Sequence, residues 1–184
     1  LIRFLIGDFK QVFSKLEIFI KERPLAGKPD QMCEVDTDDH AILLFELENG
    51  AVGTLEATKV ATGTNDEVRL EIHGEKGAIR FNSMQPNYLE IYDCNDSEEP
   101  VGGMRGFKAI ETVQRYPKPA LAFPGPKFSI GWIRYHAGNS YDFIKNIADC
   151  KKPDADLYSG YKVQEVIEAA SISDLERRWV ELPL

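Results

Sequence analysis

The sequence lacks long apolar runs and any excess of positive charge. Its longest uninterrupted apolar run is Ala41 to Phe45 in a chain of 184 residues, whereas a membrane-spanning helix needs roughly 20 apolar residues. The formal net charge is −8, and binding to nucleic-acid phosphates calls for a basic face instead. These absences predict a soluble protein with neither a membrane nor a nucleic acid as its partner.

Cysteine is scarce and forms no recognisable framework. The three cysteines and three histidines are scattered along the chain: Cys33, Cys94, Cys150, His40, His73 and His136. This number and spacing fit neither a disulfide framework nor the C-x-x-C spacing of zinc sites. Arg3 also interrupts the first apolar stretch before a secretory signal could form. We expect free thiols, a cytoplasmic protein and no metal site.

The common catalytic and nucleotide-binding motifs are missing as well. The sequence has no Walker motif, no G-x-S-x-G and no H-E-x-x-H, and its glycine run at 102–106 has the wrong interval for a dinucleotide fingerprint. Asp36, Asp38 and Asp39 are interpreted as a solvated turn rather than as a cation site. No catalytic residue can be assigned, so the chain is expected to be incomplete as a free-standing enzyme.

A period of two dominates the sequence from Lys15 to Asp93 and is typical of β-strands. Asn49-Gly50 marks a tight hairpin, because both residues tolerate the positive φ that a type I′ turn requires. Six strands joined by short turns are expected, so the sheet is predicted to be mainly antiparallel. The predicted strands centre on residues 16–20, 40–48, 51–61, 68–72, 79–81 and 89–91.

The predicted strand over residues 40–48 is apolar on both sides. Leu43 and Phe45 face one way, whereas Ile42 and Leu44 face the other. Helices later in the chain can cover one side of the sheet, but an apolar patch on the other side usually marks an interface. We therefore predict self-association through this open face of the sheet.

Helices are predicted only after a long irregular segment. Residues 95–129 hold five of the ten prolines, which predicts a Pro/Gly-rich loop, either functional or a mobile surface insertion. Helical spacing then covers residues 131–152 and 159–178. The second helix is expected to bury Val163, Val166, Ile167 and Ala170. The predicted fold is one α+β domain over residues 1–184, with a mainly antiparallel open-faced sheet and helices on one face.

One polar loop stands out as a candidate binding site. Residues 61–66 lie between two predicted strands, are rich in hydrogen-bonding groups and follow Lys59 closely. A short polar loop with one cation, held between strands, suits a polyhydroxylated or acidic small molecule. An ordinary hairpin connection fits the same composition.

The surrounding segment, LEATKVATGTNDEVRLEIHGEKGAIRF at 55–81, resembles the central sheet of the C-terminal domain in the Gfo/Idh/MocA (glucose–fructose oxidoreductase / inositol dehydrogenase) family. Residues 158–169 resemble that family's G-x-x-V-x-x-V-I-E-A helix, and residues 173–183 resemble its S…W-V-x-L-P ending. The opening LIRFLIGDFKQV resembles the segment that follows the family's Asp-x-x-x-His helix turn. The resemblance covers essentially the whole chain in order, and it implies a dihydrodipicolinate-reductase-like C-terminal fold.

The resemblance also implies a function. Family members carry a Rossmann domain, with the dinucleotide fingerprint and the principal catalytic groups, ahead of this domain. The chain would then be the C-terminal substrate-binding and oligomerisation domain of an NAD(P)-dependent oxidoreductase acting on a sugar, polyol or related secondary alcohol. It would hold no catalytic or cofactor-binding residue and would be inactive alone, with NAD or NADP bound only by the full-length protein. The apolar opening at Leu1 agrees with the expectation that sequence precedes it.

The substrate contacts implied by the resemblance are Lys59, Thr62, Gly63, Asn65, Trp132 and His136. Lys59 would donate hydrogen bonds to hydroxyl or carboxylate oxygens. Trp132 and His136 would offer an aromatic wall to a sugar ring. Two alternatives stay open at these positions, because Lys59 can be a surface lysine on a strand and Trp132 can belong to the core.

Two other functions compete with this interpretation. A non-catalytic ligand-binding or dimerisation module would have the same domain without a redox partner, and an upstream G-x-G-x-x-G with Glu-Lys-Pro would distinguish the two. A self-sufficient hydrolase lacks any nucleophile motif in this sequence.

Overall fold

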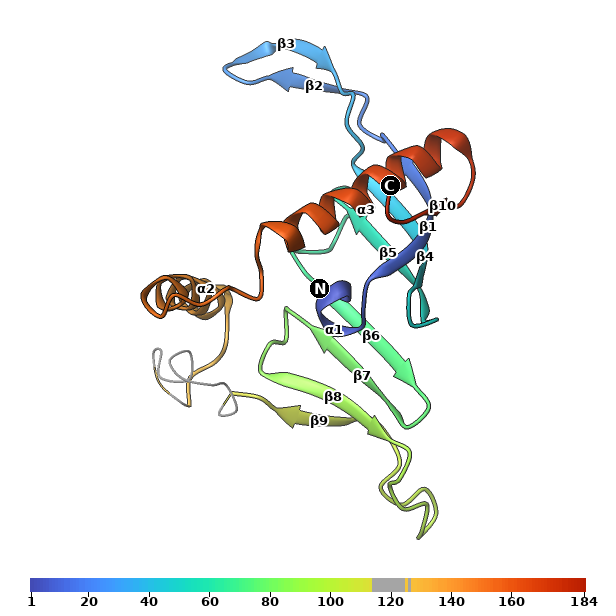
Figure 1. The fold of residues 1–184 in the computed structure, drawn as a ribbon, viewed down its shortest axis with the longest axis vertical. Coiled ribbons are helices and arrows are strands. Elements are labelled where there is room, and N and C mark those ends of the chain that lie inside the picture. The colour runs from blue at the N-terminus through green and yellow to red at the C-terminus, as the bar shows by residue number, and fades with distance from the viewer. Residues whose placement is uncertain (114–124, 126) are drawn as a thin grey trace. The chain divides into compact units, whose positions relative to one another are not determined.

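The computed structural model describes residues 1–113, 125 and 127–184 (Figure 1). The chain divides into two compact units, unit 1 (Leu1–Gly63 with Asp154–Leu184) and unit 2 (Thr64–Pro153). Each unit contains a four-stranded antiparallel sheet and one long helix. The predicted α+β class with mainly antiparallel pairing is therefore confirmed. Within the described residues, no helix combines the length and the apolar character that crossing a membrane requires.

Unit 1 is a sheet with a helix across one face and a hairpin at one end (Figure 1). Its elements are α1 (Ile2–Leu5), β1 (Phe9–Glu17), β2 (Glu22–Leu25), β3 (Lys28–Glu34), β4 (His40–Leu47), β5 (Val52–Thr58), α3 (Leu157–Glu176) and β10 (Val180–Glu181). The strand order in the sheet is β10-β1-β4-β5, and β2 pairs only with β3. The β2–β3 hairpin projects beyond the sheet, and every residue in its two strands is exposed.

The two faces of β4 differ as the alternation predicts. Leu43 and Phe45 are buried, whereas Ile42 and Leu44 are 43% and 44% exposed. Phe45 belongs to a core formed by β1, β4, α3 and the segment from β10 to Leu182: Val12, Phe45, Leu47, Ala169, Val180 and Leu182. A Cβ on Gly53 would lie 2.4 Å from the Phe45 ring, so only glycine lets this ring pack across β5. Unit 1 thus has one covered face and one open face.

Buried serines attach α3 to the sheet. The Ser14 hydroxyl donates to the Ala170 carbonyl at 2.5 Å, and the Ser14 N–H donates to Ser173 Oγ at 3.0 Å. The Ser173 hydroxyl in turn donates to the Arg178 carbonyl at 2.7 Å. Because each buried polar group finds a partner, the helix is fixed in register against β1.

Unit 2 is a second antiparallel meander followed by a helix. Its elements are β6 (Arg69–Gly74), β7 (Gly77–Asn82), β8 (Tyr88–Asp93), β9 (Lys108–Glu111) and α2 (Trp132–Ala148), with strand order β6-β7-β8-β9. Glu71 pairs with Arg80 and Ile72 with Ile79, so one side of the sheet is polar and the other apolar. This unit supplies the polar hollow described below.

Several element boundaries differ from those predicted. The first strand was expected at 16–20 but runs from Phe9 to Glu17, because the buried polar Ser14 hides the alternation of its covered side. The β2–β3 hairpin was missed, since Pro24 and Gly27 were interpreted as the end of a strand. Gly27, at φ +77°, instead forms the hairpin turn. The strand β9 lies inside the predicted loop 95–129, of which residues 114–124 and 126 fall outside the described residues.

Both long helices are confirmed within a few residues of their predicted bounds. The predicted buried face of α3 is only partly correct, because Ala170 is buried but Val163 and Ile167 are 49% and 54% exposed. These two side chains line a groove that stays open in unit 1. The groove belongs to the candidate site.

Candidate functional site

The six candidate contact residues fall into two sets. Lys59, Thr62 and Gly63 lie in unit 1, immediately after β5, and Asn65, Trp132 and His136 lie in unit 2. All six are exposed. Exposure leaves each of them available to a ligand, and each set is described within its own unit.

Lys59 extends the β4–β5 ladder by one residue. His40 pairs with Thr58, and the Lys59 N–H donates to the Asp39 carbonyl at 2.9 Å. The Thr58 hydroxyl oxygen accepts the Val60 N–H at 3.2 Å. The Lys59 backbone is therefore held on both sides, whereas its ammonium group has no hydrogen-bond or ion-pair partner among the described residues.

Asp39 is the buried anchor of this region, and the sequence interpretation as a solvated turn is wrong for it. The residue is only 5% exposed, and its two carboxylate oxygens accept the N–H groups of Phe19 and Ile20 at 2.9 Å each. These two bonds, with that from Phe19 the larger contribution, lower the pKa of the carboxyl from its ordinary value. The alternation that buries Leu43 extends back to Asp39, and this signal could have indicated that Asp39 is buried, although not what it binds.

A mainly apolar groove lies on the covered face of unit 1. Its volume is about 440 Å³, and β4, β5 and α3 contribute to its lining through Ala41, Leu43, Leu55, Ala57, Val163 and Ile167. Leu55, Ala57 and Lys59 occupy alternate positions of one extended segment, so Lys59 lies one step beyond the groove. The arrangement places a cation that has no partner among the described residues at the end of an apolar surface, as small-molecule sites commonly do.

The other candidates in unit 2 include an aromatic cluster at the start of α2. The Trp132 and His136 rings stack at 6.2 Å between centroids, and Tyr135 meets Trp132 edge-on at 6.1 Å. Trp132 is 52% exposed, which argues against the core alternative. On another side of the helix, buried Arg134 donates to the Gly125 carbonyl at 2.8 Å. The exposed rings offer a flat surface that can stack against the apolar face of a sugar.

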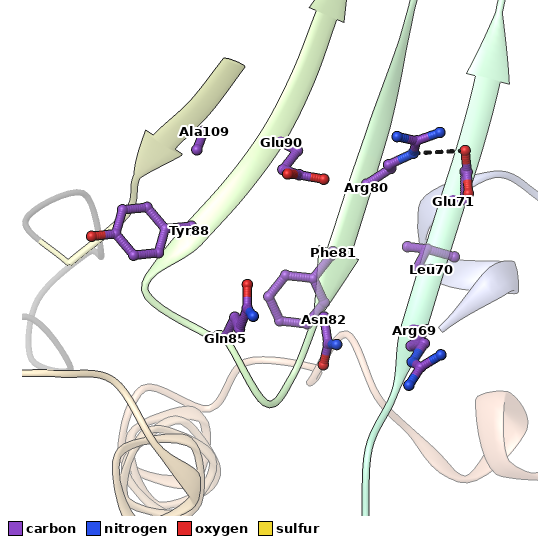
Figure 2. A pocket seen from close by; sticks show the side chains of 10 residues that line it. All are labelled: Arg69, Leu70, Glu71, Arg80, Phe81, Asn82, Gln85, Tyr88, Glu90 and Ala109. Carbon is purple, nitrogen blue, oxygen red and sulfur yellow. Dashed lines mark hydrogen bonds and ion pairs between the residues drawn. The ribbon is translucent and has the colours of Figure 1, made fainter. Parts of the chain in front are cut away.

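A hollow of about 500 Å³, which the sequence did not indicate, lies on the sheet of unit 2. Figure 2 shows the polar and apolar side chains that line it. Arg80 donates to Glu71 at 2.8 Å, and its guanidinium lies 3.8 Å from the Phe107 ring centroid. This hydrogen bond from Arg80 lowers the pKa of Glu71. Glu90, the cross-strand partner of Arg80 on β8, has no hydrogen-bond or ion-pair partner within the described part of the chain. The alternation of polar and apolar residues in β6 was the available signal.

The glycine-rich run does not fit a dinucleotide. Residues 102–106 belong to the connection between β8 and β9, where the Met104 N–H donates to the Ser97 carbonyl at 3.0 Å. A Cβ on Gly103 would lie 2.2 Å from that carbonyl oxygen, so this glycine closes a tight loop. A strand rather than a helix follows, and the run therefore lacks the helix N-terminus on which a pyrophosphate would bind.

Fold and site together define a class: an α+β domain with open-faced antiparallel sheets and exposed polar groups beside them. The comparison with protein families agrees, since the model of the "oxidoreductase family, C-terminal alpha/beta domain" matches residues 1–182. The chain belongs to this family, the C-terminal domain of the Gfo/Idh/MocA oxidoreductases.

Individual relatives support the assignment. Levoglucosan dehydrogenase from Pseudarthrobacter phenanthrenivorans is 31% identical over 98% of this chain and 48% of its own length. The structure of a levoglucosan dehydrogenase complex with NADH and L-sorbose matches with a TM-score of 0.89 and 32% identity, over 99% of this chain and 47% of that one. An oxidoreductase domain protein from Kribbella flavida has a TM-score of 0.88 at 32% identity over the same shares. The chain spans about half the length of these relatives.

Proposed function

We propose that this chain is the substrate-binding and oligomerising C-terminal domain of an NAD(P)-dependent oxidoreductase that acts on a sugar, polyol or related secondary alcohol. The observation that carries the proposal is the match over 99% of the chain to a dehydrogenase complex with NADH and L-sorbose. In the intact protein, a Rossmann domain ahead of Leu1 would hold NAD or NADP. When bound, the nicotinamide supplies hydride chemistry, and the chain alone would be inactive.

In this proposal, unit 1 contributes Lys59 and the loop after it. The free ammonium group of Lys59 donates hydrogen bonds to substrate hydroxyl oxygens. The Thr62 hydroxyl adds a donor and an acceptor. Gly63, at φ +92° with no atom within 4 Å of an added Cβ, lets the chain turn without a side chain in the way. Lys59 and its loop would thus hold and orient the substrate and leave the redox step to groups outside this chain.

Unit 2 has candidate stacking and amide contacts of its own. The Trp132 and His136 rings can cover the apolar face of a sugar, and the Asn65 amide can pair with adjacent hydroxyls. Levoglucosan is the first substrate to test, because several of the relatives are named levoglucosan dehydrogenase.

Self-association through the open face of unit 1 is also part of the proposal. Ile42 and Leu44 are exposed at the centre of that face, and Trp179, 42% exposed, packs on Phe13 at 5.8 Å between centroids. Exposed apolar clusters of this kind favour contact with a second copy. A cytoplasmic location fits the three free, exposed cysteines.

The test is an initial-rate assay of the intact protein with NAD and a panel of sugars that includes levoglucosan. The proposal expects turnover, and expects Lys59→Met to raise the KM for the sugar roughly tenfold or more through the lost charged hydrogen bonds. The KM for NAD should stay unchanged. Lys28→Met, in the exposed β3 strand, is the matched control. Sugar binding without turnover would favour the non-catalytic module, and neither binding nor turnover would refute the proposed function.

A further inference from the structure

The carboxylate of Asp39 occupies a junction in unit 1. Oδ1 accepts the Phe19 N–H and Oδ2 accepts the Ile20 N–H, both at 2.9 Å. Residues 19 and 20 connect the end of β1 to the projecting β2–β3 hairpin. With 5% of the residue exposed, both oxygens are satisfied by backbone donors, the arrangement that a buried carboxylate requires.

The backbone of Asp39 makes two further bonds. Its N–H donates to the Glu17 carbonyl at 3.1 Å, and its carbonyl accepts the Lys59 N–H at 2.9 Å. Asp39 therefore connects three segments: the end of β1, the start of β4 and the residue that follows β5. Its side chain fixes where its own backbone lies, and that backbone fixes Lys59.

Lys59 depends on such an anchor because its side chain is long and flexible. The ammonium group has no partner among the residues that the structure describes, so only the Lys59 backbone defines where the charge can reach. A displacement of about 1 Å in a substrate-positioning group can reduce activity substantially.

We propose that Asp39 is a positioning residue for Lys59, acting through the shared backbone hydrogen bond rather than by touching the substrate. The inference rests on the proposed function, which makes Lys59 a substrate contact. It adds a residue that governs how tightly the sugar is held and that lies just before β4, well before the contact loop in the sequence.

Asp39→Asn is the sharpest variant, because it preserves size and removes one acceptor. The amide nitrogen would face a backbone N–H where an oxygen now accepts, so one hydrogen bond is lost and two donors oppose each other. Asp36→Asn is the matched control, since it removes the same charge from an exposed neighbour. Asp39→Ser retains one acceptor and serves as the milder variant if Asp39→Asn does not fold.

The experiment uses the intact protein, with hydrogen exchange over residues 17–20 and 55–63 measured beside steady-state kinetics. In Asp39→Asn, amide exchange in both segments should accelerate about tenfold. The KM for the sugar should rise about five- to tenfold while the KM for NAD stays constant. In a Lys59→Met background, Asp39→Asn should add no further rise in the sugar KM, because both changes act through one contact. Asp36→Asn should change none of these quantities.

Three results for Asp39→Asn would overturn the inference. They are unchanged amide exchange at 55–63, an unchanged KM for the sugar, or a rise in that KM that is equal in the native and the Lys59→Met backgrounds. The last would indicate general destabilisation. The Lys59→Met variant by itself shows whether the proposed function fails. If that substitution alone leaves the sugar KM unchanged, Lys59 is not a substrate contact and the positioning role falls with it.

Discussion

At the scale of single residues, unit 1 depends on a few buried polar groups whose partners are mostly backbone atoms. Ser14, Asp39 and Ser173 each hold segments that are distant in sequence. Glu165, also buried, accepts from the Tyr161 hydroxyl at 3.1 Å, the Leu184 N–H at 3.3 Å and the Lys162 ammonium group. Removing one partner from such a group leaves the other unsatisfied, which costs more than an average hydrogen bond contributes.

Ser173→Ala should therefore destabilise the domain by about 2 kcal/mol. The substitution leaves the Ser14 N–H and the Arg178 carbonyl without this shared partner. Urea unfolding followed by circular dichroism measures the change in the free energy of unfolding. Ser171→Ala, at an exposed position of the same helix, is the control and should change stability by no more than ~0.5 kcal/mol. Equal effects of both substitutions would show that the serine network contributes nothing specific.

Asp39 also makes the stability of the domain depend on pH, with a loss of stability expected as the pH falls. Its folded-state pKa is lowered by the N–H groups of Phe19 and Ile20, with a smaller contribution from the charge of Arg23, while in the unfolded chain it returns to about 3.9. The stability it contributes is fully present above that pH and is lost as pH falls toward the folded-state pKa. Unfolding measured between about pH 5 and 2 should show a shallower loss of stability in Asp39→Asn than in the native chain. An identical slope would contradict the account.

At the scale of elements, alternation predicted the strands best where one face is uniformly apolar. The two sides of β4 could be assigned from sequence because its buried side carries apolar residues such as Leu43 and Phe45 at successive alternate positions. The first strand could not, since Ser14 is buried by hydrogen bonds to α3 that no local pattern indicates. The β2–β3 hairpin could not either, because all its residues are exposed and give no burial period.

The candidate site likewise has residues that could be predicted from the sequence and others that could not. Lys59 and its loop could be proposed from composition and resemblance, because polar groups between strands are visible in sequence. The role of Asp39 could not, because it depends on N–H groups twenty positions earlier that only the fold brings near. The hollow of unit 2 depends likewise on cross-strand register, which brings Arg80 opposite Glu71.

The open face of unit 1 gives a prediction at the same scale. Ile42→Asp should leave the fold intact, because the side chain is 43% exposed, and should weaken self-association by placing a charge in the proposed interface. Light scattering reports the mass and circular dichroism the fold. Leu43→Asp, one residue along on the buried side, should instead unfold unit 1. A monomeric native protein at high concentration would refute the proposed interface.

At the scale of the whole molecule, the central claim is that substrate binding and cofactor binding belong to different domains of the intact protein. The proposed substrate contacts are exposed groups of this chain, and its glycine run forms a tight loop that leads into a strand. Relatives of twice its length include complexes with NADH. We therefore propose that this chain holds the substrate and that the remainder of the intact protein binds the cofactor.

Calorimetric titration with NADH tests this claim most directly. Residues 1–184 should give no binding heat, whereas the intact protein should bind NADH with a Kd in the micromolar range, about −8 kcal/mol. The folded state of the chain is confirmed beforehand by circular dichroism. Micromolar binding of NADH by residues 1–184 alone would contradict the account.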